Sequence, residues 1–414
     1  MKLLKLTVVI PTRERADTLF HTLRTVLEQE YENLEILVSD NASIDNTRQV
    51  VSQFSDVRLR YINTGNRIGM SENWEFALSH VTGDFVMYLG DDDGLLPNAC
   101  NDIASIINNS GTRALIWNKA TYNWPSLKQS PNFISLQCTF NLCEMRGEIM
   151  LRGIASGKTS YGRLPVLYSG FVSMDVVNSV KRKTGNFFQS ITPDVYSGIV
   201  LAGELPTYLY SFRPFSINGA SSHSNGIATF TNDIKAQRFF KENDLQINCQ
   251  VPIIMGSIQS HVAESFLQAQ QFGLLKKFRL HFNRIHNNIF QELLLLEPIL
   301  RQNGLQTLSS LHLNKKNRQL VESELIKFEE NKFQQIRAET KQLFNNSINI
   351  NGNVSFNAIQ IGIENSYDAC RFLGIILGKY SIPSQIIKAN YLAYFIVVCK
   401  RYFSKVFAKF QLPL

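Results

Sequence analysis

Three adjacent aspartates, Asp91, Asp92 and Asp93, directly follow the apolar run Phe85–Leu89. Adjacent carboxylates repel one another unless a cation is present, and oxygen-rich sites of this kind suit Mg²⁺ or Mn²⁺, with phosphate oxygens completing the shell. A solvated acidic turn that caps the helix beginning near Pro97 is the alternative interpretation. The position of the three carboxylates at the end of a predicted strand favours the metal site.

Polar residues also follow two other predicted strands. Pro11, Thr12 and Arg13 come after the first apolar run, and Asp40 and Asn41 come after the second. The carboxylate of Asp40 can accept hydrogen bonds from a base or a ribose, although alone it would more often be a turn residue.

A loop with two glycines, Asn63–Gly69, carries Arg67, which can reach a phosphate or a base. Its spacing is not GxGxxG, so the dinucleotide-binding fingerprint is absent.

Short apolar runs alternate with segments of helical spacing through the first 120 residues, which predicts a mostly parallel, doubly wound α/β sheet. Ligands bind beyond the carboxyl ends of such strands, so the polar clusters are expected to meet in one crevice. Strands are predicted at Leu6–Ile10, Leu34–Val38, Val57–Ile62, Phe85–Leu89 and Ala114–Trp117, and helices are predicted to start near Asp17, Asp45, Ser71 and Pro97.

The remainder of the chain shows a different pattern. Phe272–Leu296 has apolar residues near helical spacing, which predicts a helical region over 226–345. Residues 346–414 form a basic, apolar C-terminal segment, with no acidic residue after Asp368. Within it, Ala389–Cys399 is too short to span a bilayer, which needs about 20 residues. This stretch either lies in the headgroup region of an anionic membrane or packs on the catalytic domain or another subunit.

Composition sets broad limits. The 414 residues, 44% of them hydrophobic, can bury the cores of two or three domains. Six cysteines lack metal-ligand spacing and fit a reducing cytoplasm. Met1–Ile10 lacks the features of a signal peptide and is predicted to be the first strand. The net charge of +8 does not predict nucleic-acid binding, because the basic excess gathers near the C-terminus and no nucleic-acid module is present.

The motifs together resemble family 2 glycosyltransferases with the GT-A fold. The resemblance is clear to about residue 120 and looser from there to 225, and it implies a catalytic domain over 1–225 with a Rossmann-like mixed sheet. It rests on Thr7-Val8-Val9-Ile10-Pro11-Thr12, on Val38-Ser39-Asp40-Asn41-Ala42-Ser43-Ile44-Asp45-Asn46-Thr47 and on Gly83-Asp84-Phe85-Val86-Met87-Tyr88-Leu89-Gly90-Asp91-Asp92-Asp93.

The resemblance implies a nucleotide-sugar pocket at the strand ends, with Pro11, Thr12 and Asp40 lining the nucleoside part and Arg67 near the base. Arg13 and Asn41 belong to the same two loops and are assigned to the same pocket.

The resemblance also assigns roles to the aspartate run. Asp91 would face the ribose, Asp92 would ligate Mn²⁺ or Mg²⁺, and Asp93 would support the site or share in ligation. The sequence departs from the commoner Asp-Ser-Asp-Asp form in having Gly90 where the first aspartate often stands.

Inverting enzymes of this family need a carboxylate that takes the proton of the acceptor hydroxyl, and Asp194 stands at the expected place. Asp175 and Glu204 are alternative bases, and Asp194 is alternatively a helix cap. The metal would neutralise charge on the leaving diphosphate. His223 is either a late metal or phosphate contact or an ordinary loop histidine.

The leading hypothesis is an inverting sugar transfer from a UDP- or dTDP-type donor to a hydroxyl of a saccharide or lipid-linked acceptor, in bacterial surface polysaccharide synthesis. The protein would be cytoplasmic, with peripheral contact to the inner face of the membrane, and a homo-oligomer is one arrangement compatible with it. A noncatalytic nucleotide-sugar-binding or scaffolding module is the alternative. A nucleotidyltransferase is disfavoured because the segment from Pro11 to Arg15 contains no glycine.

Overall fold

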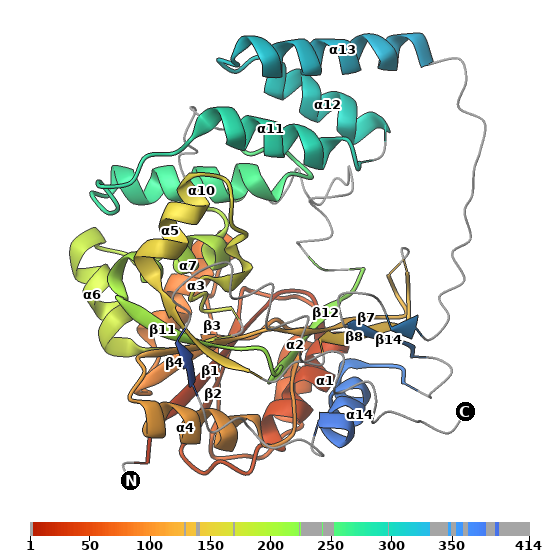
Figure 1. Ribbon diagram of the computed structural model, residues 1–414. Coiled ribbons are helices and arrows are strands. Elements are labelled where there is room, and N and C mark those ends of the chain that lie inside the picture. The colour runs from red at the N-terminus through yellow and green to blue at the C-terminus, as the bar shows by residue number, and fades with distance from the viewer. Residues whose placement is uncertain are drawn as a thin grey trace.

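A computed structural model provides the fold. In the described part of the chain, strands form two sheets and most of the helices after residue 252 form a separate layer (Figure 1). The residues described are 3–127, 130–137, 141–168, 170–222, 224, 242, 252–296, 298–331, 347–348, 353–358, 363–377 and 386–388.

The larger sheet contains nine of the described strands and is mixed. Strand β1 has β2 and β4 parallel to it on either side, whereas β10 and β9 run antiparallel to their neighbours β4 and β11. Across the sheet the order is β15 (Ile386–Lys388), β9 (Leu142–Arg146), β11 (Thr207–Ser211), β6 (Ala114–Trp117), β10 (Gly170–Ser173), β4 (Phe85–Tyr88), β1 (Leu6–Thr12), β2 (Leu34–Asp40) and β3 (Leu59–Asn63).

The smaller sheet contains six of the described strands. Its β12 pairs with β5 and β7, so that strands from before and after residue 200 meet next to the aspartate run. The order is β13 (Ser347–Ile348), β14 (Asn353–Asn357), β8 (Phe133–Gln137), β7 (Ala120–Asn123), β12 (Ser216–Ala220) and β5 (Gly94–Leu95).

Helices cover both faces of the larger sheet. Neighbouring residues of β1 therefore enter different cores, with Val8 in the cluster beneath α1 and α4 and Val9 in the cluster beneath α3, α5, α6 and α7. A strand buried on both faces has a continuous apolar run, and β1 and β2 could therefore be predicted from the sequence. The helices are α1 (Ala16–Leu27), α2 (Thr47–Ser52), α3 (Met70–Ser79), α4 (Ala99–Ser110), α5 (Gly147–Ala155), η1 (Tyr161–Arg163), α6 (Met174–Thr184), α7 (Pro193–Glu204), α10 (Ile258–Gln271), α11 (Phe282–Leu293), α12 (Pro298–Ser309), α13 (Lys315–Asn331) and α14 (Ser366–Leu377).

The predicted fold class is confirmed: a mixed α/β sheet is followed by a largely helical region. All five predicted strands are present, shifted by at most two residues at either end. The predicted helical periodicity over Phe272–Leu296 was wrong in its first part. Residues 272–281 form the turn between α10 and α11, where Gly273 and Leu275 have φ values of +81° and +55°.

The helix predicted to start near Ser71 is α3, which begins at Met70, but Ser71 does not cap it. The N-cap residue is Gly69, whose backbone N–H donates to the Glu72 carboxylate at 2.9 Å. Ser71 lies inside the first turn and donates its hydroxyl to the carbonyl oxygen of Ser190 at 2.5 Å. The Ser71 hydroxyl therefore bonds a distant backbone oxygen instead of capping α3.

Part of the stretch after residue 346 returns to the sheets. β14 pairs with β8, β15 pairs with β9, and α14 packs on α1, where the guanidinium of Arg24 lies 3.6 Å from the ring centre of Tyr367. This stretch was predicted to be part of the basic, apolar C-terminal segment, and its sequence pattern does not indicate such pairing. Ala389–Cys399 lies outside the described residues. The division at residues 225 and 345 stays a prediction.

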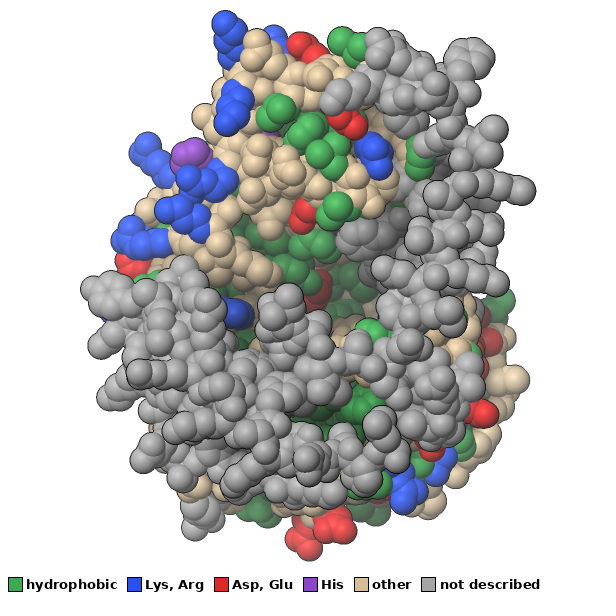
Figure 2. All heavy atoms as spheres, turned by 45° about the vertical axis from the view of Figure 1, so that its right-hand side comes forward, with side chains coloured by type: hydrophobic (Ala, Val, Ile, Leu, Met, Phe, Trp, Pro, Cys, Tyr) green, Lys and Arg blue, Asp and Glu red, His purple; other side chains and the backbone are tan. Residues whose placement is uncertain are grey.

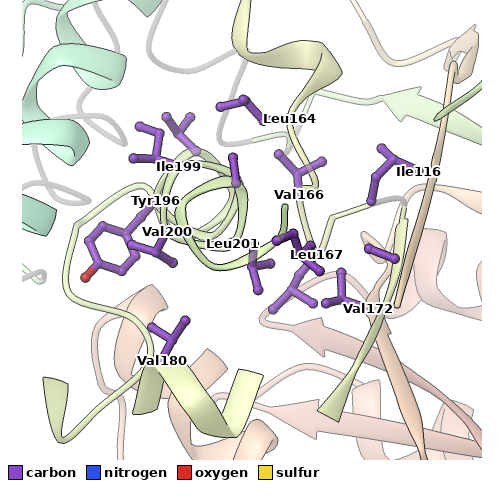
Figure 3. Close-up of a cluster of buried hydrophobic side chains, with 14 of the residues drawn as sticks. Ile116, Leu164, Val166, Leu167, Val172, Val180, Tyr196, Ile199, Val200 and Leu201 are labelled. Atoms are coloured by element: carbon purple, nitrogen blue, oxygen red, sulfur yellow. The ribbon is translucent and has the colours of Figure 1, made fainter. Parts of the chain in front are cut away.

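Helix α7 is held in the centre of one core. Figure 3 shows it with Leu164, Val166 and Leu167 on one side and Val180 of α6 on another. Gly198 lets α7 approach this segment closely, because a Cβ there would lie 2.6 Å from Val166. The amino end of α7, which carries Asp194, therefore stands on a rigid support.

Helices α10 to α13 pack in sequence around their own cluster of apolar side chains, and α10 also packs on α7. None of the helices in the described part of the chain is both long enough and apolar enough to cross a membrane.

His261 on α10 makes the stability of this region depend on pH. It is buried, and its burial lowers the pKa of the imidazole to about 4. Because the unfolded chain has a histidine pKa of about 6.5, the unfolded state takes up the proton first as the pH falls. Stability is full above about pH 6.5 and is lost as the pH falls toward 4.

Between pH 7 and pH 5 we expect His261 to account for a loss of about 2 kcal/mol in the free energy of unfolding. Urea denaturation of the wild type and of His261→Gln at both pH values measures this loss. The variant is expected to lose less stability by that amount, and equal losses in the two proteins would contradict the assignment.

Candidate functional site

The ends of β1 and β2 lie side by side, with Thr12 opposite Asp40. Both carboxylate oxygens of the buried Asp40 accept hydrogen bonds from the protein. Oδ2 accepts from the Tyr61 hydroxyl at 2.6 Å and the Asn63 amide at 3.1 Å, and Oδ1 accepts from the backbone N–H of Ser43 at 3.0 Å. Asp40 thus fixes the ends of β2 and β3, and its contact with a nucleoside stays a prediction.

Asn41 fixes the loop that carries Arg67. Its side-chain amide makes two hydrogen bonds to the backbone of Ile68, accepting from the N–H at 2.9 Å and donating to the carbonyl oxygen at 2.8 Å. Gly65 in this loop has a φ of +74°, a conformation that favours glycine. The sequence indicated the loop, but it did not indicate that Asn41 holds it.

Two of the predicted arginines converge on one carboxylate. Glu242 accepts from Nη1 of Arg13 at 2.9 Å and from Nη2 of Arg67 at 3.0 Å. Burial lowers the pKa of Arg13, Glu242 opposes this shift and the charge of Arg67 adds to it. The two guanidinium groups therefore lie at a spacing that suits a single anion. Pro11 lies beside them, partly exposed, near the end of β1.

Arg15 pairs with the first residue of the aspartate run. Its Nη1 lies 2.7 Å from Oδ1 of Asp91, which is almost fully buried. Burial raises the pKa of Asp91 and Arg15 opposes that shift. Burial alone would lower the pKa of Arg15, but attraction by Asp91 and Asp92 raises it. The sequence analysis missed Arg15, although its position two residues after Arg13 was a usable signal.

Asp92 is held from the smaller sheet and the turn after it. Its Oδ2 accepts from the hydroxyls of Ser221 at 2.8 Å and Ser224 at 2.5 Å, and its carbonyl oxygen accepts from the indole N–H of Trp124 at 2.9 Å. His223 stands between the two serines in the sequence but lies outside the described residues. Its metal contact therefore stays a prediction.

Asp93 joins the two sheets. Its Oδ2 accepts from the Tyr168 hydroxyl at 2.5 Å and the N–H of Gly90 at 3.1 Å, and its Oδ1 accepts from the N–H of Gly219 at 2.7 Å. Burial and the neighbouring charge of Asp92 raise the pKa of Asp93 to about 7. These contacts give Asp93 a supporting role, and its part in metal ligation stays a prediction.

The glycine before the aspartate run has a steric reason. A Cβ at Gly90 would lie 2.5 Å from the Tyr168 hydroxyl oxygen and 2.9 Å from Oδ2 of Asp93. An aspartate at this position has no room while Tyr168 bonds Asp93.

Asp194 lies in the first turn of α7, with Pro193 before it at the first helical position. Burial raises the pKa of its carboxyl, while the backbone N–H of Val195 and the charge of Lys119 oppose that shift. Its charge also raises the pKa values of Tyr161 and Tyr168, although burial has the larger effect on both. Asp194 therefore lies close enough to Tyr168 and Lys119 for their charges to interact.

The two alternative bases lie elsewhere. Asp175 is exposed on α6. Glu204 stands at the opposite end of α7, about 15 Å from Asp194 at the rise of an α-helix. It accepts from Ser179 and Lys183, both at 2.6 Å. Neither carboxylate is placed next to the aspartate run as Asp194 is.

Lys119 is a cation between the aspartate run and Asp194, and the sequence analysis missed it. Its Nζ donates to Oδ1 of Asn218 at 3.2 Å and lies 4.6 Å from the ring centre of Tyr168. Burial lowers the pKa of Lys119, and the charges of Asp93 and Asp194 oppose that shift. A lone lysine after a strand carries no recognisable pattern, so only the fold brings it here.

Four aromatic residues near the site divide into two groups. Trp117, Tyr122 and Trp124 are buried, and the indole N–H of Trp117 donates to Ser216 at 2.8 Å, so these three form core. Tyr161 is only partly exposed, and burial together with the charge of Asp194 raises the pKa of its hydroxyl.

The side chains offer few metal ligands by themselves. The described residues contain no group of three or more His, Cys, Asp or Glu side chains arranged to hold a metal ion. Mg²⁺ is commonly held by only one or two carboxylates together with substrate phosphates. Asp92 fits that arrangement, because the described residues donate hydrogen bonds to its Oδ2 and none of them donates to its Oδ1.

The face between the sheets and the helical layer is hollowed. Figure 2 shows green hydrophobic and red acidic side chains on the floor of this hollow, below the helical layer.

Comparison with known proteins identifies the family of the first part of the chain. Residues 7–150 match the model of the glycosyl transferase family 2 domain. This part of the chain is a family 2 glycosyltransferase domain. It includes all of the predicted nucleotide-sugar-binding residues together with Asp92 and Asp93, whereas Asp194 lies beyond the matched region.

Relatives of the family 2 domain are bacterial glycosyltransferases. GalNAc(5)-diNAcBac-PP-undecaprenol beta-1,3-glucosyltransferase of Campylobacter jejuni is 36% identical over 107 residues, covering 25% of this chain and 35% of the relative. UDP-Glc:alpha-D-GlcNAc-diphosphoundecaprenol beta-1,3-glucosyltransferase WfgD of Escherichia coli is 33% identical over 91 residues, covering 22% and 36%. The chain thus spans about a third of the length of these relatives.

Among solved structures, S. aureus TarS 1-349 in complex with UDP-GlcNAc aligns with a TM-score of 0.44 and 14% identity. The alignment covers 79% of this chain and 91% of that one.

The contact between β12 and the aspartate run leaves no room for a side chain at Gly219, where a Cβ would lie 1.7 Å from the carbonyl oxygen of Asp92. We expect Gly219→Ala to lower the free energy of unfolding by about 1–3 kcal/mol, because Asp92 and β12 must separate. Urea denaturation measures the change.

Gly162→Ala is the matched control, since a Cβ there meets nothing closer than 3.8 Å. A surface substitution of this kind is expected to change stability by less than about 0.5 kcal/mol. If the two variants were equally stable, the close packing of β12 against Asp92 would be wrong.

Proposed function

We propose that the chain is an inverting glycosyltransferase that moves a sugar from a UDP- or dTDP-type donor to a hydroxyl of a saccharide or lipid-linked acceptor, in bacterial surface polysaccharide synthesis. The observation that carries the proposal is the position of Asp194. This carboxylate, partly buried, lies close enough to interact with Lys119 and Tyr168, the two residues on which Asp93 of the family 2 domain also acts. The relatives named above, as glucosyltransferases, support the reaction class.

The donor nucleotide binds at the ends of β1 and β2. Arg13 and Arg67 already converge on the carboxylate of Glu242, and a donor phosphate would replace that anion with a stronger charge. Asp40 and Asn41 hold the floor and the loop of this pocket. Asp91, neutralised by Arg15, stands next to the pocket and faces the ribose.

A divalent cation, Mn²⁺ or Mg²⁺, fits Asp92, and when bound it would neutralise charge on the leaving nucleoside diphosphate. Ser221 and Ser224 orient the Asp92 carboxylate by bonding one of its oxygens. Asp93 keeps the loop in place through Tyr168 and Gly219.

Asp194 takes the proton from the acceptor hydroxyl while that oxygen attacks the anomeric carbon. Burial raises the pKa of Asp194, which makes the carboxylate a stronger base than an exposed aspartate. Lys119, close enough to act on both Asp93 and Asp194, supplies a fixed positive charge between the two halves of the site.

The cellular setting extends the same proposal. A cytoplasmic protein that meets its acceptor at the inner face of the membrane would use the apolar, aromatic stretch Ala389–Cys399, flanked by Lys388 and Lys400, as a peripheral contact. Binding of the wild type and of a chain truncated after Lys388 to anionic vesicles would test this contact.

Nucleotide binding tests the donor part of the proposal. Thermal unfolding is measured with UDP, dTDP and GDP, each with and without Mn²⁺. UDP or dTDP is expected to stabilise the native state by about 2.7 kcal/mol at 100 times its dissociation constant, and only with the metal present.

Asp92→Ala is expected to abolish the metal-dependent part of this shift, whereas Asp17→Ala, at an exposed aspartate of α1, is expected to retain it. A folded wild-type protein that responds to no nucleotide would instead favour a noncatalytic module.

Asp194→Asn tests the base. We expect kcat to fall by about 10²–10⁴-fold, because the amide cannot accept the proton, while the nucleotide-induced thermal shift stays unchanged. In the wild type, kcat should fall as the pH drops through the raised pKa of Asp194, because protonation removes the base. Steady-state kinetics over a pH series measures both effects.

Glu204→Gln is the matched control at the other end of α7. It is expected to keep kcat within about 2-fold, as distant surface changes do. Full activity in Asp194→Asn would assign the base elsewhere.

A further inference from the structure

A buried polar cluster connects the helical region to the loop that carries Asp194. Glu264 of α10 is fully buried, and its Oε2 accepts a hydrogen bond from the Ser190 hydroxyl at 2.8 Å. The next residue, Ser265, lies 3.0 Å from the Ser190 hydroxyl and 3.1 Å from the Thr192 hydroxyl. Burying a carboxylate and three hydroxyls is costly unless they bond one another, so this arrangement fixes the geometry of the contact.

The cluster acts on the residues directly before Asp194. Thr192 is the N-cap residue of α7, but its hydroxyl bonds no backbone N–H of that helix and instead faces Ser265. A threonine at this position ordinarily caps its own helix. Here its side chain ties the start of α7 to α10.

The same loop is tied to the nucleotide side of the site. The carbonyl oxygen of Ser190 accepts from the Ser71 hydroxyl at 2.5 Å, and Ser71 belongs to α3, which follows the Arg67 loop. Ser190 thus contacts three elements at once: α3 through its carbonyl oxygen, α10 through its hydroxyl and α7 through the chain.

We infer that Glu264 is a positioning residue for Asp194, so that the helical region completes the catalytic site rather than serving as a separate module. The inference rests on the proposed function, because it assigns Glu264 to the placement of the proposed base. Glu264 acts through Ser190 and the amino end of α7. Misplacement of a catalytic group by about 1 Å can cost about 100-fold in rate.

The helical region offers a matched control. Glu292 of α11 also accepts from a serine, since its Oε2 lies 2.6 Å from the Ser257 hydroxyl and 3.1 Å from the backbone nitrogen of Gln259. This pair holds α10 to α11 and is not bonded to the loop before Asp194. Replacing Glu292 therefore weakens the helical region without releasing that loop.

Hydrogen exchange of the full chain tests the inference without any substrate. Glu264→Leu is expected to raise amide exchange in residues 187–197, whereas Glu264→Gln, which keeps an acceptor oxygen for Ser190, is expected to restore the wild-type pattern. Glu292→Leu is expected to raise exchange in α10 and α11 only. Unchanged exchange of residues 187–197 in Glu264→Leu, or an equal rise in Glu292→Leu, would overturn the inference.

Transfer kinetics then test the consequence. Glu264→Leu is expected to lower kcat by about 10–100-fold while the donor dissociation constant stays within about 2-fold, and Glu264→Gln is expected to restore kcat. A released loop with unchanged kcat would overturn the catalytic role of Glu264. A wild type that transfers no sugar would defeat the proposed function, and the exchange comparison would still decide whether Glu264 fixes the loop.

Discussion

Burial of three consecutive carboxylates after β4 is the constraint on which the surrounding structure depends, because each carboxylate needs partners that stabilise its charge. Asp91, Asp92 and Asp93 repel one another and lose the stabilisation that water gives to charge. Each has a different set of partners: a guanidinium for Asp91, two hydroxyls for Asp92, and a phenol with two backbone N–H groups for Asp93. Of the three, Asp93 makes contacts with both sheets and is the one most fully committed to the fold.

These partners come from distant parts of the chain, which explains why two sheets must meet here. Gly219 and Ser221 belong to β12 and the turn after it, and Tyr168 directly precedes β10. The approach is so close that Gly90 and Gly219 have no room for side chains. The aspartate run therefore has its present shape only when β12 has paired with β5 and β7.

The sequence allowed prediction wherever local pattern determines structure. Strands β1, β2 and β4 are buried on both faces, so they appear as unbroken apolar runs, and the polar residues after them mark the site. The antiparallel insertion of β10 and the return of β14 and β15 were not predictable, because a short strand has no local signal for its partner. Lys119 and Glu264 were missed for the same reason: their roles come from tertiary contacts.

The two halves of the proposed site differ in how far local sequence pattern determines their structure. The nucleotide side is built mainly from residues 11–93, where each functional side chain stands at the end of a strand whose place in the sheet is fixed by its neighbours. The base side depends on α7, whose start is held by Ser71 from one direction and by α10 from another. A change in the helical region would therefore reach Asp194 through Ser190 and Thr192. The matched family 2 region, residues 7–150, contains the nucleotide side but not Asp194, so the two sides also differ in whether sequence comparison reaches them.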